Sequence, residues 1–363
     1  MAPDSAREGE GALPARYYHA PDIYVRETER IFHQSWFCVG RESEIARARD
    51  AIVREVAGES LVILRDDGGA VRAFYNVCQH RAANVCAGDG PLAAGVLVCP
   101  YHRWTYALDG RLVGTPKMQE PPGFTRARHG LKAVHVMLWQ GFVFVSLAET
   151  PESFAPNLGG IGTRLHAYNM AALVPARTAV YDMAANWKVV IENFCECYHC
   201  PGVHPELCDI IPGFRSGVIQ QENPGGAIFV EGGRTTNFDA KTKRPLISTV
   251  EPKDQGGFRS TTVYPNLLLV MVPDHVQAWT LWPMGPQRTR VVFEWLFEPK
   301  TIARPDFDMS DVGAFMDLVN NQDKDVCESV QKGVASRGFS GAVYSLGEHL
   351  PRKFNAWVRE RIG

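Results

Sequence analysis

Short hydrophobic runs separated by turn-forming residues dominate the first half of the chain. Between residues 51 and 147 the sequence contains S-L-V-I-L-R, D-D-G-G and A-V-R-A-F-Y-N-V, and later G-V-L-V-C-P and G-F-V-F-V-S-L. Short runs rich in Val, Ile and Phe and bounded by Gly, Asp and Pro are typical of β-strands. The pattern predicts a small all-β domain, which we place at residues 37–150.

Helical spacing precedes this region. Residues 22–39 place Ile23, Ile31 and Trp36 among charged side chains, as an amphipathic helix would. We therefore expect residues 1–36 to form a tail and a lead-in helix packed on the first domain. Residues 150–162 contain two prolines and three glycines and are predicted to be the linker to a second domain.

The second domain, residues 151–363, contains both strand-like and helical patterns. Strand-like runs lie at residues 227–231, 258–272, 275–282 and 288–297, and helical patterns lie at residues 311–333 and 342–362. Strands grouped together and followed by helices predict an α+β domain built on an antiparallel sheet. The predicted fold class of the whole chain is accordingly α+β.

Composition narrows the function classes. The chain of 363 residues is 45% hydrophobic and 21% charged, with a formal net charge of −2. This balance does not favour nucleic acid or an anionic membrane as a partner. The N-terminus has no apolar signal region, so we expect a cytoplasmic protein. The nine cysteines are odd in number and cluster with histidines, which favours metal ligands or inert thiols over a disulfide framework.

The most informative stretch is residues 192–204, E-N-F-C-E-C-Y-H-C-P-G-V-H. A helical pattern leading into it predicts that Glu196 and His199 lie one turn apart on one helix face. Pro201 and Gly202 can stop that helix and turn the chain, so that His204 meets the same metal as His199. Two histidines that need one carboxylate are the pattern of non-haem Fe(II) oxygenases. A zinc site built on neighbouring cysteines is the alternative, with candidates Cys195, Cys197, Cys200 and Cys208.

The first domain carries a second set of metal-ligand residues. Cys78 and His80 form C-x-H, and Cys99 and His102 form C-x-x-H after eighteen intervening residues. Two thiolates on one iron and two imidazoles on the other are the ligands of a Rieske cluster. A Cys2His2 zinc site is the alternative, although zinc sites more often pair C-x-x-C with H-x-x-x-H.

These motifs together resemble the α subunits of Rieske non-haem iron oxygenases. The resemblance rests on C-Q-H-R and C-P-Y-H-R-W in the first domain, and on N-W-K and E-N-x-x-E-C-Y-H-x-x-x-x-H in the second. It implies a Rieske 2Fe-2S domain followed by a helix-grip catalytic domain. Ala82 and Arg103 depart from the family pattern, which often has Gly at both places.

The resemblance also implies a role for each candidate residue. Cys78, His80, Cys99 and His102 would bind the cluster. His199 and His204 would bind the mononuclear iron together with a carboxylate in N-N-Q-D-K-D, for which the family pattern selects Asp323 over Asp325. Glu196 would be the catalytic bridge between His199 and the cluster ligand His102 of a neighbouring subunit.

One 2Fe-2S cluster and one mononuclear Fe(II) per subunit are the implied cofactors. Electrons from NAD(P)H would arrive through a separate flavin and iron-sulfur reductase, because the chain has no G-x-G-x-x-G motif after a strand. In the family the cluster and iron of one chain are too far apart and those of neighbouring chains are close. We therefore expect a homotrimer that acts on O2 and a small molecule.

A glutamate at the bridge resembles the members that oxidise quaternary amines such as glycine betaine, stachydrine, carnitine or choline. We therefore expect O2-dependent hydroxylation and N-demethylation of such a compound. An aromatic cage would suit its cation. The alternatives are hydroxylation of an aromatic ring or acid, and a Rieske electron carrier without oxygen chemistry. The candidates for the cage are Phe194, Tyr198, Phe214, Trp279, Trp282 and Trp295.

Overall fold

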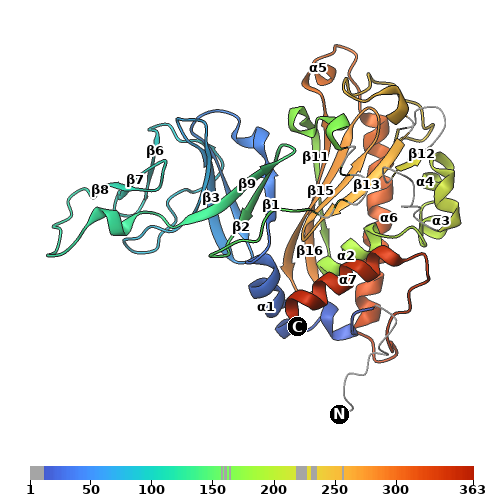
Figure 1. Ribbon diagram of the computed structural model, residues 1–363, viewed down its shortest axis with the longest axis horizontal. Coiled ribbons are helices and arrows are strands. Elements are labelled where there is room, and N and C mark those ends of the chain that lie inside the picture. Colours follow the sequence, from blue (N-terminus) through green and yellow to red (C-terminus); the bar gives the residue numbers. More distant parts are fainter. Residues whose placement is uncertain are drawn as a thin grey trace. The chain divides into compact units, whose positions relative to one another are not determined.

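The chain folds into two units in the computed structural model, which describes residues 12–156, 158, 162, 165–217, 227–229, 235–255 and 257–363 (Figure 1). One unit is Phe32–Phe154, and the other joins Met1–Ile31 to Ala155–Gly363. Within the described residues, no helix is long and apolar enough to cross a bilayer.

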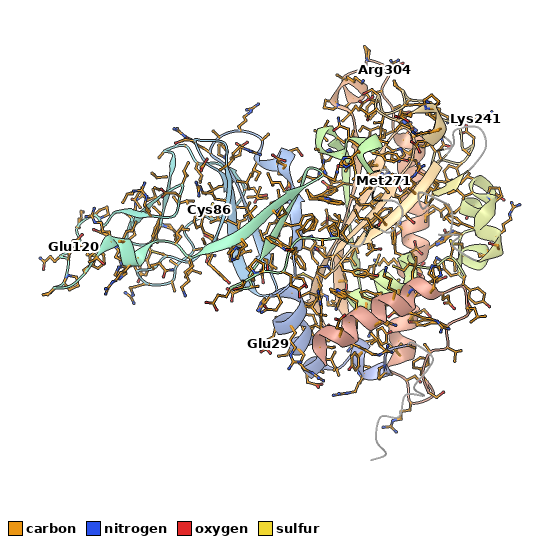
Figure 2. The ribbon with its side chains drawn as sticks, in the orientation of Figure 1. Glu29, Cys86, Glu120, Lys241, Met271 and Arg304 are labelled. Carbon is orange, nitrogen blue, oxygen red and sulfur yellow. A yellow bond between two sulfur atoms is a disulfide. The ribbon has the colours of Figure 1, made fainter. Side chains whose placement is uncertain are left out.

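The unit Phe32–Phe154 is built from β-strands, as predicted. A seven-stranded sheet has the order β1-β10-β9-β4-β3-β2-β5, and a separate three-stranded sheet has the order β6-β7-β8. Their hydrophobic faces enclose a core that includes Cys86, labelled in Figure 2. The strands are β1 Phe37–Arg41, β2 Asp50–Val56, β3 Glu59–Arg65, β4 Val71–Tyr75, β5 Gly90–Pro91, β6 Val96–Val98, β7 Thr105–Ala107, β8 Leu112–Gly114, β9 Ala133–Trp139 and β10 Phe142–Ser146.

The lead-in segment differs from the prediction in two ways. Its helix α1, Pro21–Glu27, continues only as the π-helical turn Thr28–Phe32, and the following residues form strand β1. The segment up to Ile31 also belongs to the second unit and not to the first. A buried ion pair explains this, because Glu27 of α1 bonds the ammonium of Lys188, and both side chains are fully buried.

The second unit is built on a six-stranded sheet of order β11-β16-β15-β14-β13-β12, in which every neighbouring pair is antiparallel. The predicted run 258–272 is two strands, with Met271 of β14 labelled in Figure 2. Strand β11 was not predicted, and part of the predicted linker lies outside the described residues. The strands are β11 Val174–Met183, β12 Ala227–Phe229, β13 Gly257–Val263, β14 Leu267–Met271, β15 Val276–Gly285 and β16 Arg288–Phe297.

Helices cover this sheet and confirm the α+β class. Helix α2, Trp187–Phe194, packs on α6, on α7 and on β15, while α6 also packs on β11. The predicted helix at 311–333 is α6, and the one at 342–362 begins only at His349. The α-helices after α2 are α3 Cys200–Val203, α4 Pro205–Ile210, α5 Pro299–Ile302, α6 Ser310–Val334 and α7 His349–Ile362.

Helix α2 is shorter than its hydrophobic pattern predicted. It starts at Asn186, whose side chain accepts a hydrogen bond from the backbone N–H of Lys188 at 2.9 Å, and it ends at Phe194. Glu196 and His199 therefore lie in the turn after the helix and not on one helix face. Pro201 and Gly202 do not stop a helix either, since both lie inside the short helix α3.

Three side chains hydrogen-bond one carboxyl group on α2, that of Glu192. The hydroxyl of Tyr18 donates to Glu192 Oε1 at 2.6 Å, and Tyr344 and Asn355 also hydrogen-bond Glu192. Burial raises the pKa of Glu192 from 4.5 to about 7, although the hydrogen bonds from Tyr18 and Tyr344 oppose the shift. The group thus keeps its proton in the folded chain at a pH where the unfolded chain has lost it.

This raised pKa predicts a pH-dependent effect of Glu192→Gln on stability. Between pH 4.5 and about 7 the folded state binds the extra proton, so the contribution of Glu192 to stability falls as pH rises through this window. The loss in the free energy of unfolding is at most about 3 kcal/mol. Glutamine does not titrate, so the variant does not undergo this loss. The variant should therefore gain melting temperature relative to wild type on going from about pH 5 to about pH 8. An unchanged difference would contradict the raised pKa, and the exposed Glu360→Gln is the control.

Candidate functional site

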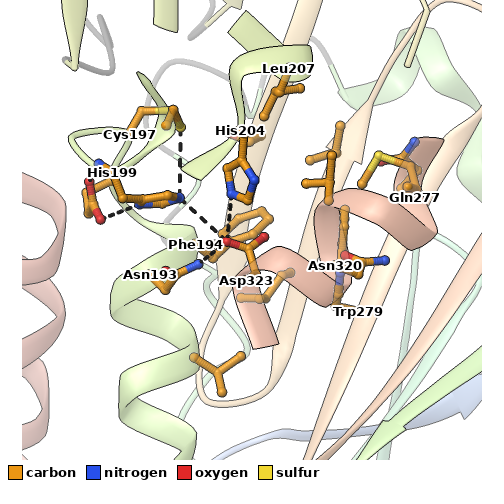
Figure 3. Close-up of a pocket in the computed structure, with 18 of the residues that line it drawn as sticks. Asn193, Phe194, Cys197, His199, His204, Leu207, Gln277, Trp279, Asn320 and Asp323 are labelled. Atoms are coloured by element: carbon orange, nitrogen blue, oxygen red, sulfur yellow. Dashed lines mark hydrogen bonds and ion pairs between the residues drawn. A yellow bond between two sulfur atoms is a disulfide. The ribbon is translucent and has the colours of Figure 1, made fainter. Parts of the chain in front are cut away.

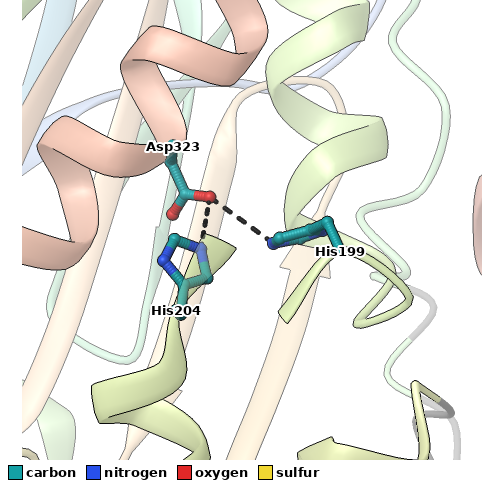
Figure 4. Close-up of side chains that lie close together, drawn as sticks. All are labelled: His199, His204 and Asp323. Atoms are coloured by element: carbon teal, nitrogen blue, oxygen red, sulfur yellow. Dashed lines mark hydrogen bonds and ion pairs between the residues drawn. The ribbon is translucent and has the colours of Figure 1, made fainter. Parts of the chain in front are cut away.

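Three predicted ligand residues meet in the second unit (Figure 4). Asp323 comes from α6, His204 precedes α4 and His199 precedes α3. Asp323 Oδ1 lies 2.9 Å from His204 Nε2 and 3.5 Å from His199 Nε2. One ligand atom from each residue lies within 4.8 Å of the others. Two imidazole nitrogens and one carboxylate converging in this way form a set suited to a divalent iron.

Each residue of this triad is held by a second side chain. His199 Nδ1 lies 2.5 Å from Glu196 Oε1, and His204 Nδ1 lies 2.7 Å from Gln322 Oε1. Both histidines thus donate from Nδ1 and direct Nε2 toward Asp323, which fixes the tautomer that a metal needs. The amide of Asn193 donates to Asp323 Oδ1 at 2.7 Å. We had not predicted Gln322 or Asn193.

The carboxylate and the imidazoles of the triad shift the pKa values of one another. Burial lowers the pKa of His199, but the carboxylates of Asp323 and Glu196 outweigh burial and raise it to about 9. Burial raises the pKa of Asp323, and the two imidazoles overcome this and lower it to about 2. Asp323 is therefore an anion, and a cation bound between the residues would replace the proton of His199.

The alternatives considered for this region do not match the structure. Asp325 is exposed and lies outside the triad. The four cysteines proposed for a zinc site do not act as a set, because Cys197 and Cys200 form a disulfide and Cys195 contacts Thr262. The expectation of ligands or inert thiols was wrong for this pair. The turn after α2 places their Cα atoms 4.9 Å apart, which is within disulfide range.

The cysteine and histidine motifs of the first unit lie on two loops with the same backbone pattern. The N–H of Cys78 donates to the carbonyl of Ala83, and the N–H of Ala82 donates back to Cys78 at 2.9 Å. In the other loop the N–H of Cys99 donates to Trp104, and that of Arg103 donates back to Cys99 at 3.1 Å. The matched loops present the two cysteines as one pair and the two histidines as another.

The side chains of these loops fit a cluster with two thiolate and two imidazole ligands. The rings of His80 and His102 have centroids 4.6 Å apart. His102 Nδ1 is buried and has no hydrogen-bond partner in the described part of the chain, as expected of a nitrogen that binds a metal. The hydroxyl of Tyr106 lies 3.2 Å from Cys78 Sγ, so it can donate to a thiolate there and influence a bound cluster. Tyr106 was not predicted, because it lies outside both ligand motifs.

The two departures from the family pattern lie at equivalent points of these loops. Ala82 has a φ of 59° and Arg103 a φ of 64°, both in the left-handed region. A residue with a Cβ pays about 1–2 kcal/mol there, whereas glycine does not. The loop geometry therefore explains why glycine is common at both places.

Ala82→Gly and Arg103→Gly should each stabilise the first unit. Relief of the left-handed strain outweighs the added chain entropy of glycine, for a net gain of about 1 kcal/mol. We expect the melting temperature, followed by the visible absorbance of the cluster, to rise by about 4 °C. Ala83→Gly is the matched control, since Ala83 does not have a positive φ, and it should lower the melting temperature.

A largely apolar pocket surrounds the triad (Figure 3). Three of the six aromatic residues proposed for a cage line it, namely Phe194, Phe214 and Trp279, and Phe258 joins them. The centroids of Phe194 and Trp279 are 5.5 Å apart, as are those of Phe214 and Phe258. Among the described residues, the lining of this pocket does not include the other three candidates, Tyr198, Trp282 and Trp295.

Comparisons with known proteins find matches for both units of the chain. Residues 35–135 match the Rieske [2Fe-2S] domain, and residues 170–363 match the ring hydroxylating alpha subunit (catalytic domain). The chain is 31% identical to the glycine betaine monooxygenase oxygenase subunit of Chromohalobacter salexigens, over 93% of this chain and 83% of that one. It is 29% identical to the carnitine monooxygenase oxygenase subunit of Escherichia coli strain K12, over 91% and 86%.

Among solved structures, the chain is similar to a quaternary ammonium Rieske monooxygenase described in connection with carnitine oxidation and inter-subunit electron transfer. The identity is 26% and the TM-score 0.76, with 96% of this chain and 95% of that chain covered. The similarity thus extends over both units.

Proposed function

The chain belongs to the α subunits of the Rieske ring-hydroxylating oxygenases, and on that basis we propose that it oxidises an N-methyl group of a quaternary ammonium compound. As a member it is an oxidoreductase with a Rieske cluster and a mononuclear iron. The match of the first unit to a Rieske domain removes the zinc alternative. The match of the second to the catalytic domain removes the pure electron carrier.

Cys78, Cys99, His80 and His102 are the residues that we propose hold the cluster. His199, His204 and Asp323 are those that we propose hold the iron. The partnerless Nδ1 of His102 and the converging atoms of the triad support these assignments. When bound, the cluster supplies single electrons and the iron provides the place where O2 reacts. The protein orients the ligands through Glu196 and Gln322 and surrounds the reacting carbon with apolar side chains.

The observation that carries the substrate assignment is the group of aromatic rings beside the triad. Phe194, Phe214, Phe258 and Trp279 line one pocket with the carboxylates of Glu196 and Asp323. Aromatic faces attract a quaternary ammonium ion, which cannot donate a hydrogen bond from nitrogen. A cation held there would place an N-methyl group in the pocket that contains the triad. Hydroxylation of an N-methyl carbon would give an N–CH2OH group, whose C–N bond then breaks to release formaldehyde, a proton and the tertiary amine. Hydroxylation of the side-chain carbon bonded to nitrogen would release a larger aldehyde in the same way.

We propose that Glu196 also faces a second subunit. Its side chain is 16% exposed. Oε1 contacts His199 Nδ1, and Oε2 accepts hydrogen bonds from the backbone N–H groups of Tyr198 and His199. Each carboxylate oxygen has more than one lone pair, so a further imidazole could approach from outside. That imidazole would be His102 of a neighbouring chain, in a head-to-tail homotrimer. The separate reductase of the family would supply the electrons.

A substrate screen tests the proposed function. The enzyme loaded with iron and cluster is supplied with a surrogate reductase and offered glycine betaine, carnitine, choline and a set of aromatic acids. We expect O2 uptake coupled to formaldehyde or aldehyde release with at least one quaternary amine, and no such release by Asp323→Ala. Products from the aromatic acids alone would contradict the proposal and favour ring hydroxylation.

A further inference from the structure

A chain of buried polar side chains ends at the pocket wall, on the far side of Asp323 and Asn320 from His199 in Figure 3. Its last member is Gln277 of β15, which lines the pocket. Gln277 Nε2 lies 2.6 Å from Thr236 Oγ1 and 2.9 Å from His275 Nε2. Because most of the pocket lining is apolar, this polar wall distinguishes one end of the cavity from the rest.

The hydrogen-bond direction along this chain is fixed from its buried end. Asp274 Oδ1 accepts a hydrogen bond from Thr235 at 2.7 Å, and Arg244 pairs with Oδ2 at 3.3 Å. Burial raises the pKa of Asp274, but His275, Thr235 and Arg244 outweigh burial and hold it below its usual value. Asp274 is therefore an anion that accepts the hydrogen bond from His275 Nδ1, at 2.9 Å.

The hydroxyl of Thr236 and the ring of His275 face the amide of Gln277. The NH2 of Gln277 donates to Thr236 Oγ1 and lies beside His275 Nε2. With the NH2 on this side, Oε1 of the same amide points away from Thr236 and His275.

Gln277 Oε1 has no hydrogen-bond partner among the residues that the structure describes. The residue is 0% exposed, so its carbonyl oxygen is also shielded from solvent. A buried acceptor without a donor costs about 1–3 kcal/mol. A residue that lines a ligand pocket and carries such an oxygen is suited to receive its donor from the ligand.

We propose that Gln277 is a specificity-determining residue whose Oε1 accepts a hydrogen bond from a neutral hydroxyl or N–H group of the substrate. The inference rests on the proposed function and narrows it to quaternary ammonium compounds that carry such a donor on the side chain. The ammonium end would lie among Phe194 and Trp279 beside the triad, and the donor would reach Gln277 across the pocket. A carboxylate in that place would meet the lone pairs of Oε1 and bind less well.

Binding of matched ligands to the wild-type enzyme tests this without any mutation. Choline and propyltrimethylammonium differ by a hydroxyl in place of a methyl group. Transfer of apolar surface alone would favour the propyl compound, whereas a hydrogen bond to Gln277 should make choline bind about 10-fold more tightly. Calorimetry on the enzyme loaded with iron and cluster measures both. Equal affinities, or tighter binding of the propyl compound, would overturn the inference.

Gln277→Met locates the effect at this side chain. Methionine has a similar length but no acceptor of comparable strength, so choline should lose about 10-fold in affinity while propyltrimethylammonium should not. The cluster spectrum and iron content report whether the variant is folded. Thr236→Val, which only loosens the amide, should give a smaller loss for choline. Gln119→Met, at an exposed position, is the control for replacing a glutamine by a methionine elsewhere in the chain.

Glycine betaine separates the remaining outcomes. Glycine betaine could bind more tightly than choline, and Gln277→Met could lower its affinity. In that case the NH2 of the amide faces the pocket and the assignment of Oε1 is wrong. If these three compounds fail to bind and the substrate screen, carnitine included, shows no oxidation of any quaternary amine, the proposed function fails and this inference with it. If quaternary amines are oxidised but Gln277→Met changes both members of the matched pair equally, only the inference about Gln277 fails.

Discussion

Asp323→Ala should lose the mononuclear iron, keep the 2Fe-2S cluster and show no oxygenase activity. The substitution removes the only carboxylate of the triad and leaves the Nε2 atoms of His199 and His204 without a carboxylate between them. Two neutral imidazoles bind Fe(II) far more weakly than two imidazoles and a carboxylate. The iron content should fall from about three to about two atoms per chain, since the cluster accounts for two. The visible spectrum of the cluster should be unchanged.

Asp325→Ala is the matched control on the same helix. Its carboxylate is exposed and lies outside the triad, so iron content and activity should stay at wild-type values. The assignment of Asp323 would fail if Asp325→Ala lost the iron and Asp323→Ala retained it.

Glu196→Gln should slow oxidation of the cluster by a large factor while leaving both metal sites filled. Glutamine keeps the shape of the side chain and can still accept a hydrogen bond from His199 Nδ1. It lacks the negative charge that raises the pKa of His199 and that would favour a protonated imidazole on the other side. Stopped-flow absorbance of the reduced cluster, mixed with O2 and substrate, measures the step directly.

A purely orienting role for Glu196 gives a different result. Iron affinity would then fall by about 10-fold to 100-fold, and activity would return when iron is added. The bridge is excluded if an iron-loaded Glu196→Gln reoxidises its cluster at the wild-type rate. Gln322→Glu is a useful comparison, because Gln322 contacts the other histidine and has no proposed role between subunits.

The sequence predicted those parts of the site that depend on local motifs. Both cysteine and histidine motifs lie on short loops, and their spacing alone places the ligands at matching points. Asp323 was identified from a family pattern, because nothing within the helix distinguishes it from Asp325. Gln322 could not be foreseen, since neighbouring residues on a helix point in different directions and only tertiary packing shows which one reaches His204.

The errors in the fold prediction arise where tertiary structure overrides the local pattern. Hydrophobic residues continue past Phe194 through Cys195 and Cys197, so the pattern gave no end for α2. The chain leaves the helix after Phe194, and the turn that follows places His199 beside Asp323. Strand β11 was missed because most of its side chains are partly or fully exposed, and because it contains Pro175. A strand at the edge of a sheet shows little of the alternation that marks a half-buried strand.

The connectivity of the two units has a consequence for dissecting the protein. The first unit is an insertion, because the chain enters it after Ile31 and returns to the second unit at Ala155. A fragment of residues 155–363 would be continuous but incomplete, since it would lack Glu27 and leave the buried ammonium of Lys188 without its anion. Removing one partner of a buried pair costs about 3–5 kcal/mol. A catalytic fragment should therefore join the segment ending at Ile31 to Ala155 by a short linker in place of the first unit.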